Sequence, residues 1–204
     1  LQTPITVSST CLRVLEMETG KQKWIDKAQA QTEKLTALVN ALVTLSRMDE
    51  GVSPLKMEPF PLSEAVADTA EPFRDLAQSK GHALVLDIAP DLTYKGDEYA
   101  IRQLVSILLD NAVKYARADS PITLTLEKTR RGIALRCRNG SDPIPEDTLA
   151  KLFDRFYRAD PSRNAATGGF GIGLSIARSI AEAHRGSICA RMVGEEVEFA
   201  AELR

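Results

Sequence analysis

The stretch Gly168-Gly169-Phe170-Gly171-Ile172-Gly173-Leu174-Ser175-Ile176 decides how the rest of this chain is interpreted. Its glycines recur at every second position and lead into an apolar-periodic segment that ends near His184, which predicts a loop followed by a helix. Glycines let a backbone bend sharply and approach a ligand closely, and the first N–H groups of a helix attract an anion. The stretch therefore predicts a phosphate-binding loop, although glycine turns before helices also serve packing or capping alone.

The composition is that of a globular protein without a strong charge imbalance. The 204 residues are 44% hydrophobic, and 26 Lys and Arg against 28 Asp and Glu leave a formal charge of -2. This balance gives no electrostatic reason to expect nucleic-acid binding. Cys11, Cys137 and Cys189 are far apart and form no C-x-x-C pair, which argues against a disulfide framework or a zinc site and favours a reducing compartment. Because no apolar run is long enough to span a bilayer, we expect no direct membrane contact from these residues.

Residues 1–50 carry the apolar pattern of two helices. Spacings of three and four residues recur on both sides of a break at Thr19-Gly20, which predicts a helical hairpin. Because two helices alone bury too little apolar surface, we expect a second copy to complete a four-helix bundle, so that the protein is a homodimer. Packing of the same stripe against the rest of the chain is the alternative. The chain begins at Leu1 without an initiator methionine, so we expect it to be part of a longer protein.

A second domain is expected at residues 61–204, after a linker at residues 51–60. Helical periodicity covers residues 63–80, with Ser63 as the expected N-cap and Gly81 as the stop, and a longer helix begins at Asp97. Alternating patterns predict strands over residues 83–88, 94–96, 122–127, 133–138, 187–193 and 197–203. Since helices and strands mix without strict βαβ alternation, the expected fold is α+β, a two-layer sandwich rather than a doubly wound sheet.

The long helix that begins at Asp97 carries a second group of polar residues. Asn111, Lys114 and Tyr115 fall within about one turn, and residues three or four apart share a helix face. An amide oxygen can ligate Mg²⁺, a lysine can neutralise phosphate charge, and a tyrosine can border a base or a sugar. These residues are therefore candidates for nucleotide binding, and ordinary surface polarity is the alternative.

Two further segments complete the pattern. Asn139-Gly140-Ser141-Asp142-Pro143-Ile144-Pro145 follows a predicted strand, where it either walls a pocket or only connects the strand to a helix. Leu152-Phe153-Asp154-Arg155-Phe156-Tyr157-Arg158 is aromatic and basic, and we expect its two phenylalanines in the core. Its arginines are either surface cations, or one of them lies beside the phosphate loop and stabilises phosphoryl charge. Residues 160–167 separate this segment from the glycine stretch and are predicted to form a flap.

In this order and at this spacing, these segments resemble the N, G1, F and G2 boxes of the ATP-binding domain of sensor histidine kinases. The opening Leu1-Gln2-Thr3-Pro4-Ile5-Thr6 is similar to the end of that family's H box, usually written H-E-L-x-T-P-L-T. The resemblance covers essentially the whole chain. It implies a dimerisation and histidine-phosphotransfer domain at residues 1–50 and a catalytic domain of the GHKL type, with its Bergerat ATP-binding fold, at residues 61–204.

The resemblance implies a nucleotide site for ATP and Mg²⁺. Asn111 would ligate Mg²⁺ between the phosphates, with Lys114 and Tyr115 beside the nucleotide. Asn139 stands where the family has an aspartate that accepts a hydrogen bond from the adenine amino group, and an asparagine oxygen can accept the same bond. The other matched positions are Ile144, Tyr157, Arg158, Gly169, Gly171, Gly173 and Leu174. Ser141 and Pro143 replace the two glycines of the G1 box, which alters the adenine pocket.

The catalytic residues implied by the same match are Arg158 and Thr3. Arg158 follows the aromatic residues of the F box and would reach the γ-phosphate, while Thr3 matches the residue that orients water for dephosphorylating a response regulator. By the family's pattern, the phosphoacceptor histidine would lie two positions before Leu1. His82 and His184 fall in no acceptor motif, so they are expected to be structural or solvated, with a charged His184 favoured by the end of its helix.

The expected function is that of the cytoplasmic transmitter of a membrane-anchored sensor histidine kinase. Mg·ATP would phosphorylate a histidine, and the receiver domain of a response regulator would then take the phosphoryl group on an aspartate. The alternative, favoured by the altered G1 turn, is a nucleotide-binding regulatory or pseudokinase module that acts through its dimer surface or mainly as a phosphatase. Chaperone and topoisomerase ATPases that share the sandwich are a third option, which does not explain residues 1–50.

Overall fold

The computed structural model describes residues 55–157 and 171–204 continuously and, before them, individual helical positions between residues 7 and 39. The chain divides into two compact units, Leu1–Val52 and Ser53–Arg204. Every described position of the first unit is helical. The turn expected at Thr19-Gly20 lies outside the described residues, so the hairpin and its pairing with a second copy stay predictions. In the described part of the chain, no helix is long and apolar enough to cross a membrane.

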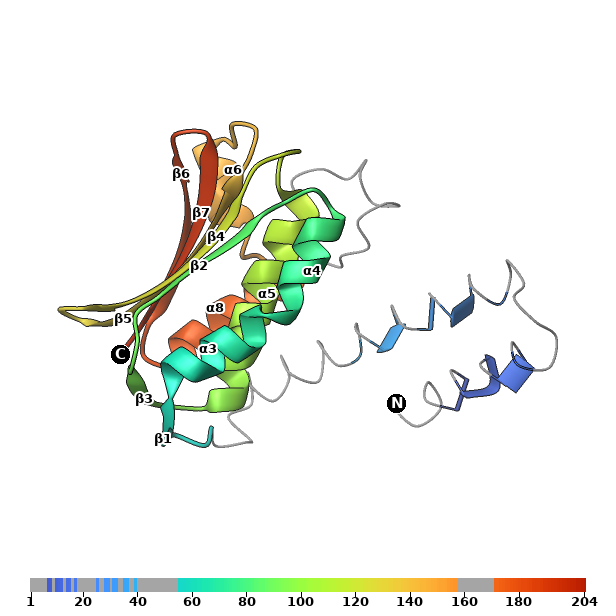
Figure 1. Cartoon of the computed structure of the whole chain (residues 1–204), viewed down its shortest axis with the longest axis horizontal. Helices are drawn as coiled ribbons and strands as arrows, with labels where there is room; N and C mark the ends of the chain where they lie inside the picture. The colour runs from blue at the N-terminus through green and yellow to red at the C-terminus, as the bar shows by residue number, and fades with distance from the viewer. Residues whose placement is uncertain are drawn as a thin grey trace. The chain divides into compact units, whose positions relative to one another are not determined.

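The second unit is built on a five-stranded sheet with the strand order β2-β4-β5-β7-β6. The strands are β2 (Leu84–Ile88), β4 (Ile122–Thr129), β5 (Gly132–Gly140), β6 (Ser187–Val193) and β7 (Glu196–Leu203). β2 and β4 run parallel, and the other neighbouring pairs are antiparallel. Four helices lie on one side of this sheet (Figure 1): α3 (Leu62–Ala70), α4 (Pro72–Ser79), α5 (Glu98–Tyr115) and α8 (Gly173–Ala183). A short helix, α6 (Glu146–Lys151), follows β5. The expected α+β two-layer sandwich is confirmed for this unit.

Helix α5 is the central element of the helical layer. The Asp97 side chain caps its first turn, because Oδ1 accepts a hydrogen bond from the Ala100 N–H at 2.9 Å. Its buried residues follow helical spacing and form one apolar face: Ala100, Ile101, Leu104, Val105, Leu108, Leu109, Ala112 and Val113. Burial of this face fixes the rotation of the helix about its axis. Lys114 and Tyr115 therefore remain exposed at its last turn.

The segment expected as one helix at residues 63–80 is two helices. Pro72 begins α4, and it has no N–H with which to continue the hydrogen-bond ladder of α3. Ser63 does not cap α3, which begins after Pro61. Instead, the Ser63 hydroxyl donates to the Ala89 carbonyl at 2.6 Å and accepts from the Leu92 N–H at 2.9 Å. The serine thus ties the start of α3 to the connection that follows β2.

Part of the segment expected as a linker forms a strand. β1 (Glu58–Pro61) pairs antiparallel with β3 (Thr93–Gly96) in a two-stranded ribbon outside the main sheet. Phe60 is buried in this ribbon and meets the Tyr94 ring in a T-shaped contact with 6.1 Å between centroids. This strand contains Pro59 and Pro61, because a strand with one ladder neighbour tolerates proline.

His184 is an interior residue held in its uncharged form. Its side chain is buried, Nε2 accepts a hydrogen bond from the Asp97 N–H at 3.0 Å, and Nδ1 donates to the Ile180 carbonyl at 2.8 Å. An imidazolium has no lone pair for the Asp97 N–H, so the charged form expected at the end of this helix does not fit the geometry. His82 is also buried, with Nδ1 3.1 Å from the Ser120 carbonyl oxygen. Both histidines are structural.

The sheet face opposite these helices carries a buried carboxylate. Glu198 alternates along β7 with Val197 and Phe199, so its side chain points to the other face. That side chain is 0% exposed and accepts hydrogen bonds from Arg138 Nε at 2.5 Å and Arg191 Nε at 2.7 Å, on the two neighbouring strands. Burial raises the pKa of Glu198, but the hydrogen bonds and charges of the two arginines outweigh it and hold the pKa below its ordinary value.

We expect Glu198→Gln to lower the free energy of unfolding by about 2 kcal/mol at neutral pH, because the two arginines lose their buried counter-charge. Since the folded-state pKa is lowered, Glu198 contributes stability above its unfolded-state pKa and loses that contribution as the pH falls through the folded-state value. In urea titrations, the difference between the two proteins should therefore shrink as the pH is lowered through the acid range. Glu202→Gln, at an exposed position of the same strand, is the control. A difference that does not change with pH would contradict this account.

Candidate functional site

Asn139, near the end of β5, holds a buried hydrogen-bond acceptor without a partner. The residue is 1% exposed, and Nδ2 donates to the Gly140 carbonyl at 3.0 Å. This bond fixes the orientation of the amide, because a carbonyl oxygen can only accept. Oδ1 is the one buried side-chain nitrogen or oxygen without a hydrogen bond among the residues that the structure describes. Leaving such an acceptor unpaired costs about 1–3 kcal/mol. The site therefore fits a ligand N–H, such as the exocyclic amino group of adenine.

The Gly140 carbonyl joins this part of β5 to the end of α5. It also accepts a hydrogen bond from the Arg117 N–H at 2.8 Å, two residues beyond the end of α5. Gly140 has no room for a side chain, since a Cβ there would lie 2.5 Å from Ser120 Cβ. Two of the predicted site residues, Tyr115 and Asn139, are therefore held at the same end of the unit.

The turn between β6 and β7 reinforces this junction. Glu195 Oε2 lies 2.7 Å from Arg117 NH2, and the Glu195 carbonyl accepts from the Ser141 N–H at 3.0 Å. Because both side chains of the ion pair are exposed to water, the pair itself contributes little to stability. The sequence interpretation missed Arg117 and Glu195. They are 78 residues apart, and no local pattern links them.

The predicted residues on α5 differ in their present partners. Asn111 is half-buried, and Lys114 Nζ lies 2.6 Å from Asp110 Oδ2, an i,i+4 ion pair at the surface. An exposed pair of this kind is weak. A phosphate could therefore draw the lysine away at little cost. Tyr115 is 39% exposed at the final residue of the helix, where one face of its ring can border a ligand.

Gly171 is positioned by the segment that follows α6. The Phe156 N–H donates to the Gly171 carbonyl at 2.9 Å. Gly171 has φ +69°, and a Cβ there would lie 2.7 Å from the Tyr157 carbonyl oxygen, so both the backbone and the available space require glycine. Gly173 begins α8, and a Cβ there would meet only Ile107 Cγ2, at 3.5 Å. Since Ile107 lies one turn before Asn111 on α5, the start of α8 lies beside the helix face that carries Asn111.

The first turn of α8 has no side-chain cap. Its backbone N–H groups are therefore suited to an anion. Ile144, Tyr157 and Leu174, also predicted site residues, are half-buried on the segments just described. Thr3, Arg158 and Gly169 lie outside the described residues, as does the predicted flap at residues 160–167.

The two phenylalanines expected in the core behave differently. Phe153 is buried and meets Phe199 in a T-shaped contact at 6.2 Å, with the Arg178 guanidinium 5.0 Å above its ring. The expectation for Phe156 is wrong, because this residue is 62% exposed and has φ +64°. Its backbone N–H instead donates a hydrogen bond to the Gly171 carbonyl. Arg178 of α8, which the sequence interpretation did not single out, also lies 3.8 Å from Asp154 and so links α8 to the same segment.

Within residues 55–157 and 171–204, no three His, Cys, Asp or Glu side chains are grouped as a metal site would need. A Mg²⁺ ion held by nucleotide phosphates needs less from the protein, because it keeps several waters and takes only one or two protein oxygens. A half-buried amide such as Asn111, close to the open first turn of α8, fits that requirement.

Comparison with known proteins agrees with this fold and identifies the family to which the chain belongs. Residues 96–204 match the histidine kinase-, DNA gyrase B-, and HSP90-like ATPases. The sensor protein DltS of Streptococcus agalactiae is 31% identical over 203 residues, which cover 100% of this chain and 51% of DltS. The signal transduction histidine-protein kinase BaeS of Escherichia coli is 32% identical over 192 residues, which cover 93% of this chain and 41% of BaeS. The chain thus spans about half the length of these relatives, or less.

Solved structures of other proteins share the fold. Full-length ShkA in complex with AMPPNP has a TM-score of 0.82 at 22% identity, over 99% of this chain and 43% of ShkA. The Acinetobacter baumannii histidine kinase AdeS has a TM-score of 0.72 at 21% identity, over 98% of this chain and 94% of AdeS.

We expect Gly171→Ala to weaken nucleotide binding by about tenfold, because it combines an unfavourable left-handed φ with a contact that displaces the loop. Gly194→Ala is the matched control, since Gly194 has φ +62° but a Cβ there would have no atom within 4 Å. Calorimetry with Mg·ATP and thermal unfolding would measure both variants. The control shares only the cost of the left-handed φ, so it should lose less stability and keep its affinity, and equal affinities in the two variants would contradict this role of Gly171.

Asn139→Asp would introduce the residue that is usual in the resembling family. Here we expect it to destabilise the fold by about 1–3 kcal/mol, because the Nδ2 bond to the Gly140 carbonyl is lost and a buried carboxylate lies beside that oxygen. We also expect weaker binding of Mg·ATP. Comparison with Asn139→Ala, which removes the donor and acceptor without adding charge, separates the two effects in urea unfolding. An aspartate variant as stable as the original protein would show that the amide orientation is not needed.

Proposed function

Because this chain belongs to the sensor histidine kinases, within the histidine kinase-, DNA gyrase B-, and HSP90-like ATPase family, we propose that it binds Mg·ATP and catalyses phosphorylation of a histidine. The observation that carries this proposal is the buried, unpartnered Oδ1 of Asn139 beside the end of α5. Because Asn139 Oδ1 can only accept a hydrogen bond and its orientation is fixed, it favours a nucleotide base that has an amino group facing it. Adenine has one, whereas guanine presents a carbonyl there, so the site favours an adenine nucleotide.

The phosphates would lie between the end of α5 and the start of α8. Lys114, which pairs with Asp110 in the absence of nucleotide, would supply a positive charge to the phosphates. The uncapped first turn of α8 would supply backbone N–H groups. Gly171 lets the chain turn tightly into that helix. Asn111 offers an amide oxygen to Mg²⁺. Bound Mg·ATP supplies the phosphoryl group, while these residues position it and neutralise its charge.

We extend the proposal to the residues outside the described part of the chain. Arg158 would stabilise charge on the γ-phosphate, Gly169 would form part of the lid hinge, and Thr3 would orient water when a response regulator is dephosphorylated. The receiver domain of such a regulator would accept the phosphoryl group on an aspartate. In a complete sensor protein, this chain would be the cytoplasmic part of a membrane-anchored molecule.

The proposed homodimer rests on the first unit. Several of its described apolar side chains are exposed in the single chain, including Met17 at 87% and Val7 at 56%. Apolar side chains at helical spacing need cover, and a second copy of the same helices supplies it in a four-helix bundle. Sedimentation of the chain as a dimer would support this arrangement.

The proposal is tested in a longer version of the protein that carries the acceptor histidine. Asn111→Asp should lower phosphoryl transfer from ATP by at least about tenfold, because a carboxylate adds repulsion next to the phosphates. Gln103→Glu makes the same amide-to-acid change earlier on α5 and serves as the control. Radiolabelled ATP measures the transfer, and calorimetry measures binding. If phosphoryl transfer is unchanged in Asn111→Asp, Asn111 is not part of the site.

A second function is favoured by one feature, the replacement of two G1-box glycines by Ser141 and Pro143. If the chain binds Mg·ATP but transfers nothing to a supplied histidine-bearing bundle, it is a regulatory or pseudokinase module, or mainly a phosphatase. If it binds no Mg·ATP at all, the kinase proposal fails.

A further inference from the structure

A cavity whose lining includes none of the proposed nucleotide-site residues collects positive charge. It has a volume of about 720 Å³ and lies where β3, the β4–β5 hairpin and the chain after α8 meet. In Figure 1, β3, the β4–β5 hairpin and the C-terminus lie near one another at this end of the unit. Four residues with cationic side chains line the cavity, Lys95, Lys128, Arg185 and Arg204, and Asp91 is the one lining residue with an acidic side chain. The whole chain has a formal charge of -2, so this concentration of cations is local.

The four cationic side chains have no partners in the described part of the chain. Neither an ion pair nor a hydrogen bond joins the side chain of Lys95, Lys128, Arg185 or Arg204 to any residue within 55–157 and 171–204. Four like charges beside one acidic side chain repel one another, and an anion between them would lower that repulsion.

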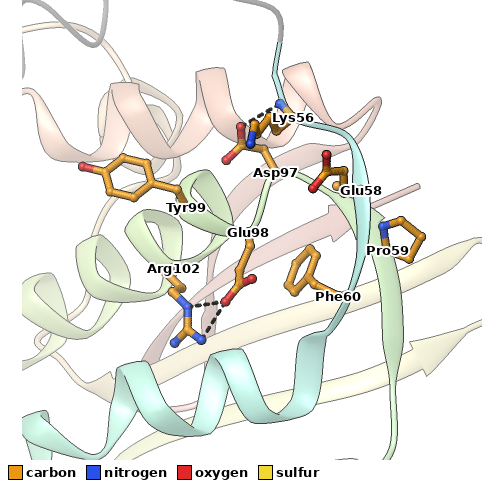
Figure 2. A pocket seen from close by; sticks show the side chains of 9 residues that line it. Lys56, Glu58, Pro59, Phe60, Asp97, Glu98, Tyr99 and Arg102 are labelled. Carbon is orange, nitrogen blue, oxygen red and sulfur yellow. Dashed lines mark hydrogen bonds and ion pairs between the residues drawn. The ribbon is translucent and has the colours of Figure 1, made fainter.

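In the cavity of Figure 2, lined in part by β1 and the first turns of α5, charged side chains are paired within the protein. This cavity has a volume of about 430 Å³, and Arg102 in its wall is paired with Glu98 at 2.7 Å. Its Asp97 side chain accepts hydrogen bonds from the backbone N–H groups of Lys56 and Ala100. Three carboxylates line that cavity, from Glu58, Asp97 and Glu98, so it offers no comparable attraction to an anion.

The basic cavity has a built, partly apolar floor. Tyr94 and Ile133 are both 7% exposed and contribute rings and methyl groups to the lining. The Tyr94 hydroxyl donates to the Arg204 carbonyl at 3.1 Å, and its ring lies 5.9 Å from that of the buried His184. The floor is therefore held in place before any ligand arrives.

Two residues of the cavity wall adopt a backbone conformation that is unfavourable for them. Arg185 and Asp91 both have φ +56°. Such a conformation costs a residue other than glycine about 1 kcal/mol. Glycine is usual at the position of Arg185, directly after a helix, and here it follows one residue later as Gly186. The arginine thus stands where glycine would stabilise the fold.

We propose that this cavity binds a small organic polyanion, one that carries two or more phosphate or carboxylate groups beside an apolar part. The volume is that of a small-molecule site, the unpaired cations come from different elements and face one hollow, and the floor is apolar. Lysine and arginine side chains bind phosphate and carboxylate groups through charge-assisted hydrogen bonds. This function goes beyond the proposed nucleotide site, because none of the lining residues belongs to that site.

Titration of the chain with inorganic tripolyphosphate in the absence of Mg²⁺ tests the charge of the site. In amide NMR spectra, we expect shifts at Tyr94, Gly132 and Ile133 of the cavity, in addition to any shifts at Gly171 and Gly173 of the nucleotide site. Lys95→Gln combined with Lys128→Gln should weaken the affinity by about tenfold or more. Lys80→Gln, an exposed lysine after α4, is the matched control and should leave the affinity unchanged.

Two further variants separate binding from folding. Arg185→Gly should weaken binding while keeping or raising the melting temperature, because glycine suits the left-handed φ. Asp91→Asn should strengthen binding by removing the one acidic side chain of the lining, and asparagine tolerates the same φ. A gain of affinity cannot arise from misfolding. Naphthyl phosphate should bind more tightly than inorganic phosphate if the apolar floor contributes.

Three results would overturn the proposal. The first is a set of NMR shifts confined to Gly171 and Gly173, and the second is an affinity that responds equally to loss of Lys80 and of the cavity lysines. The third is binding to phosphatidylglycerol vesicles without any response to tripolyphosphate, which would assign the cations to a lipid surface instead of a small ligand. None of these results counts against Mg·ATP binding, so this proposal can fail while the proposed nucleotide site stands.

Discussion

The burial of one face of α5 against the sheet is the constraint on which the rest of the second unit depends. Leu104, Leu108 and Leu109 on this face are fully buried, and each contributes about 1.5–3 kcal/mol relative to an exposed side chain. The helix can therefore neither rotate nor slide without losing several such contacts. Its first turn is fixed by the Asp97 cap and the His184 bond to the Asp97 N–H, and the chain beyond its last turn by the bond to the Gly140 carbonyl. Polar residues at its end are thereby held in place by apolar packing.

Glycine is required here by close contacts more than by turns. A Cβ at Gly186 would lie 1.7 Å from the Glu202 carbonyl oxygen, so close contact requires glycine at that position. The φ of Gly186 is not left-handed, so its backbone conformation alone would not require glycine. The left-handed residue at the end of α8 is then Arg185, one position earlier. Phe156 is likewise left-handed and donates its N–H to Gly171, whose own left-handed φ is free of strain. Among the described non-glycine residues with unfavourable φ, Phe156 thus lies beside the proposed nucleotide site, and Asp91 and Arg185 line the basic cavity.

Much of the second unit could be predicted from the sequence because its elements are strongly periodic. The apolar spacing of α5 and the alternation of β4, β5, β6 and β7 each follow from local patterns, and so does the Asp97 cap. Contacts between distant residues could not be predicted in this way. The pairing of β1 with β3, the Arg117–Glu195 ion pair and the exposure of Phe156 all depend on how separate elements meet. The unpaired Oδ1 of Asn139 could not be predicted either. The sequence shows that an asparagine is present, but its oxygen is unpaired because the residue is buried and its Nδ2 donates to the Gly140 carbonyl.

Helix α8 connects the two proposed sites through a single rigid element. Its 11 residues span about 16 Å, from Gly173 at the proposed phosphate site to Ala183, two residues before Arg185 in the basic cavity. The helix dipole suits both ends, because the N-terminus favours an anion and the C-terminus favours the arginine cation that follows it. Its middle is fixed by buried Ile176, Ala177 and Ile180. Because the dipole acts mainly within the first and last turns, each end of α8 serves its own proposed site, and the helix joins the two sites as a rigid element and not through its charge.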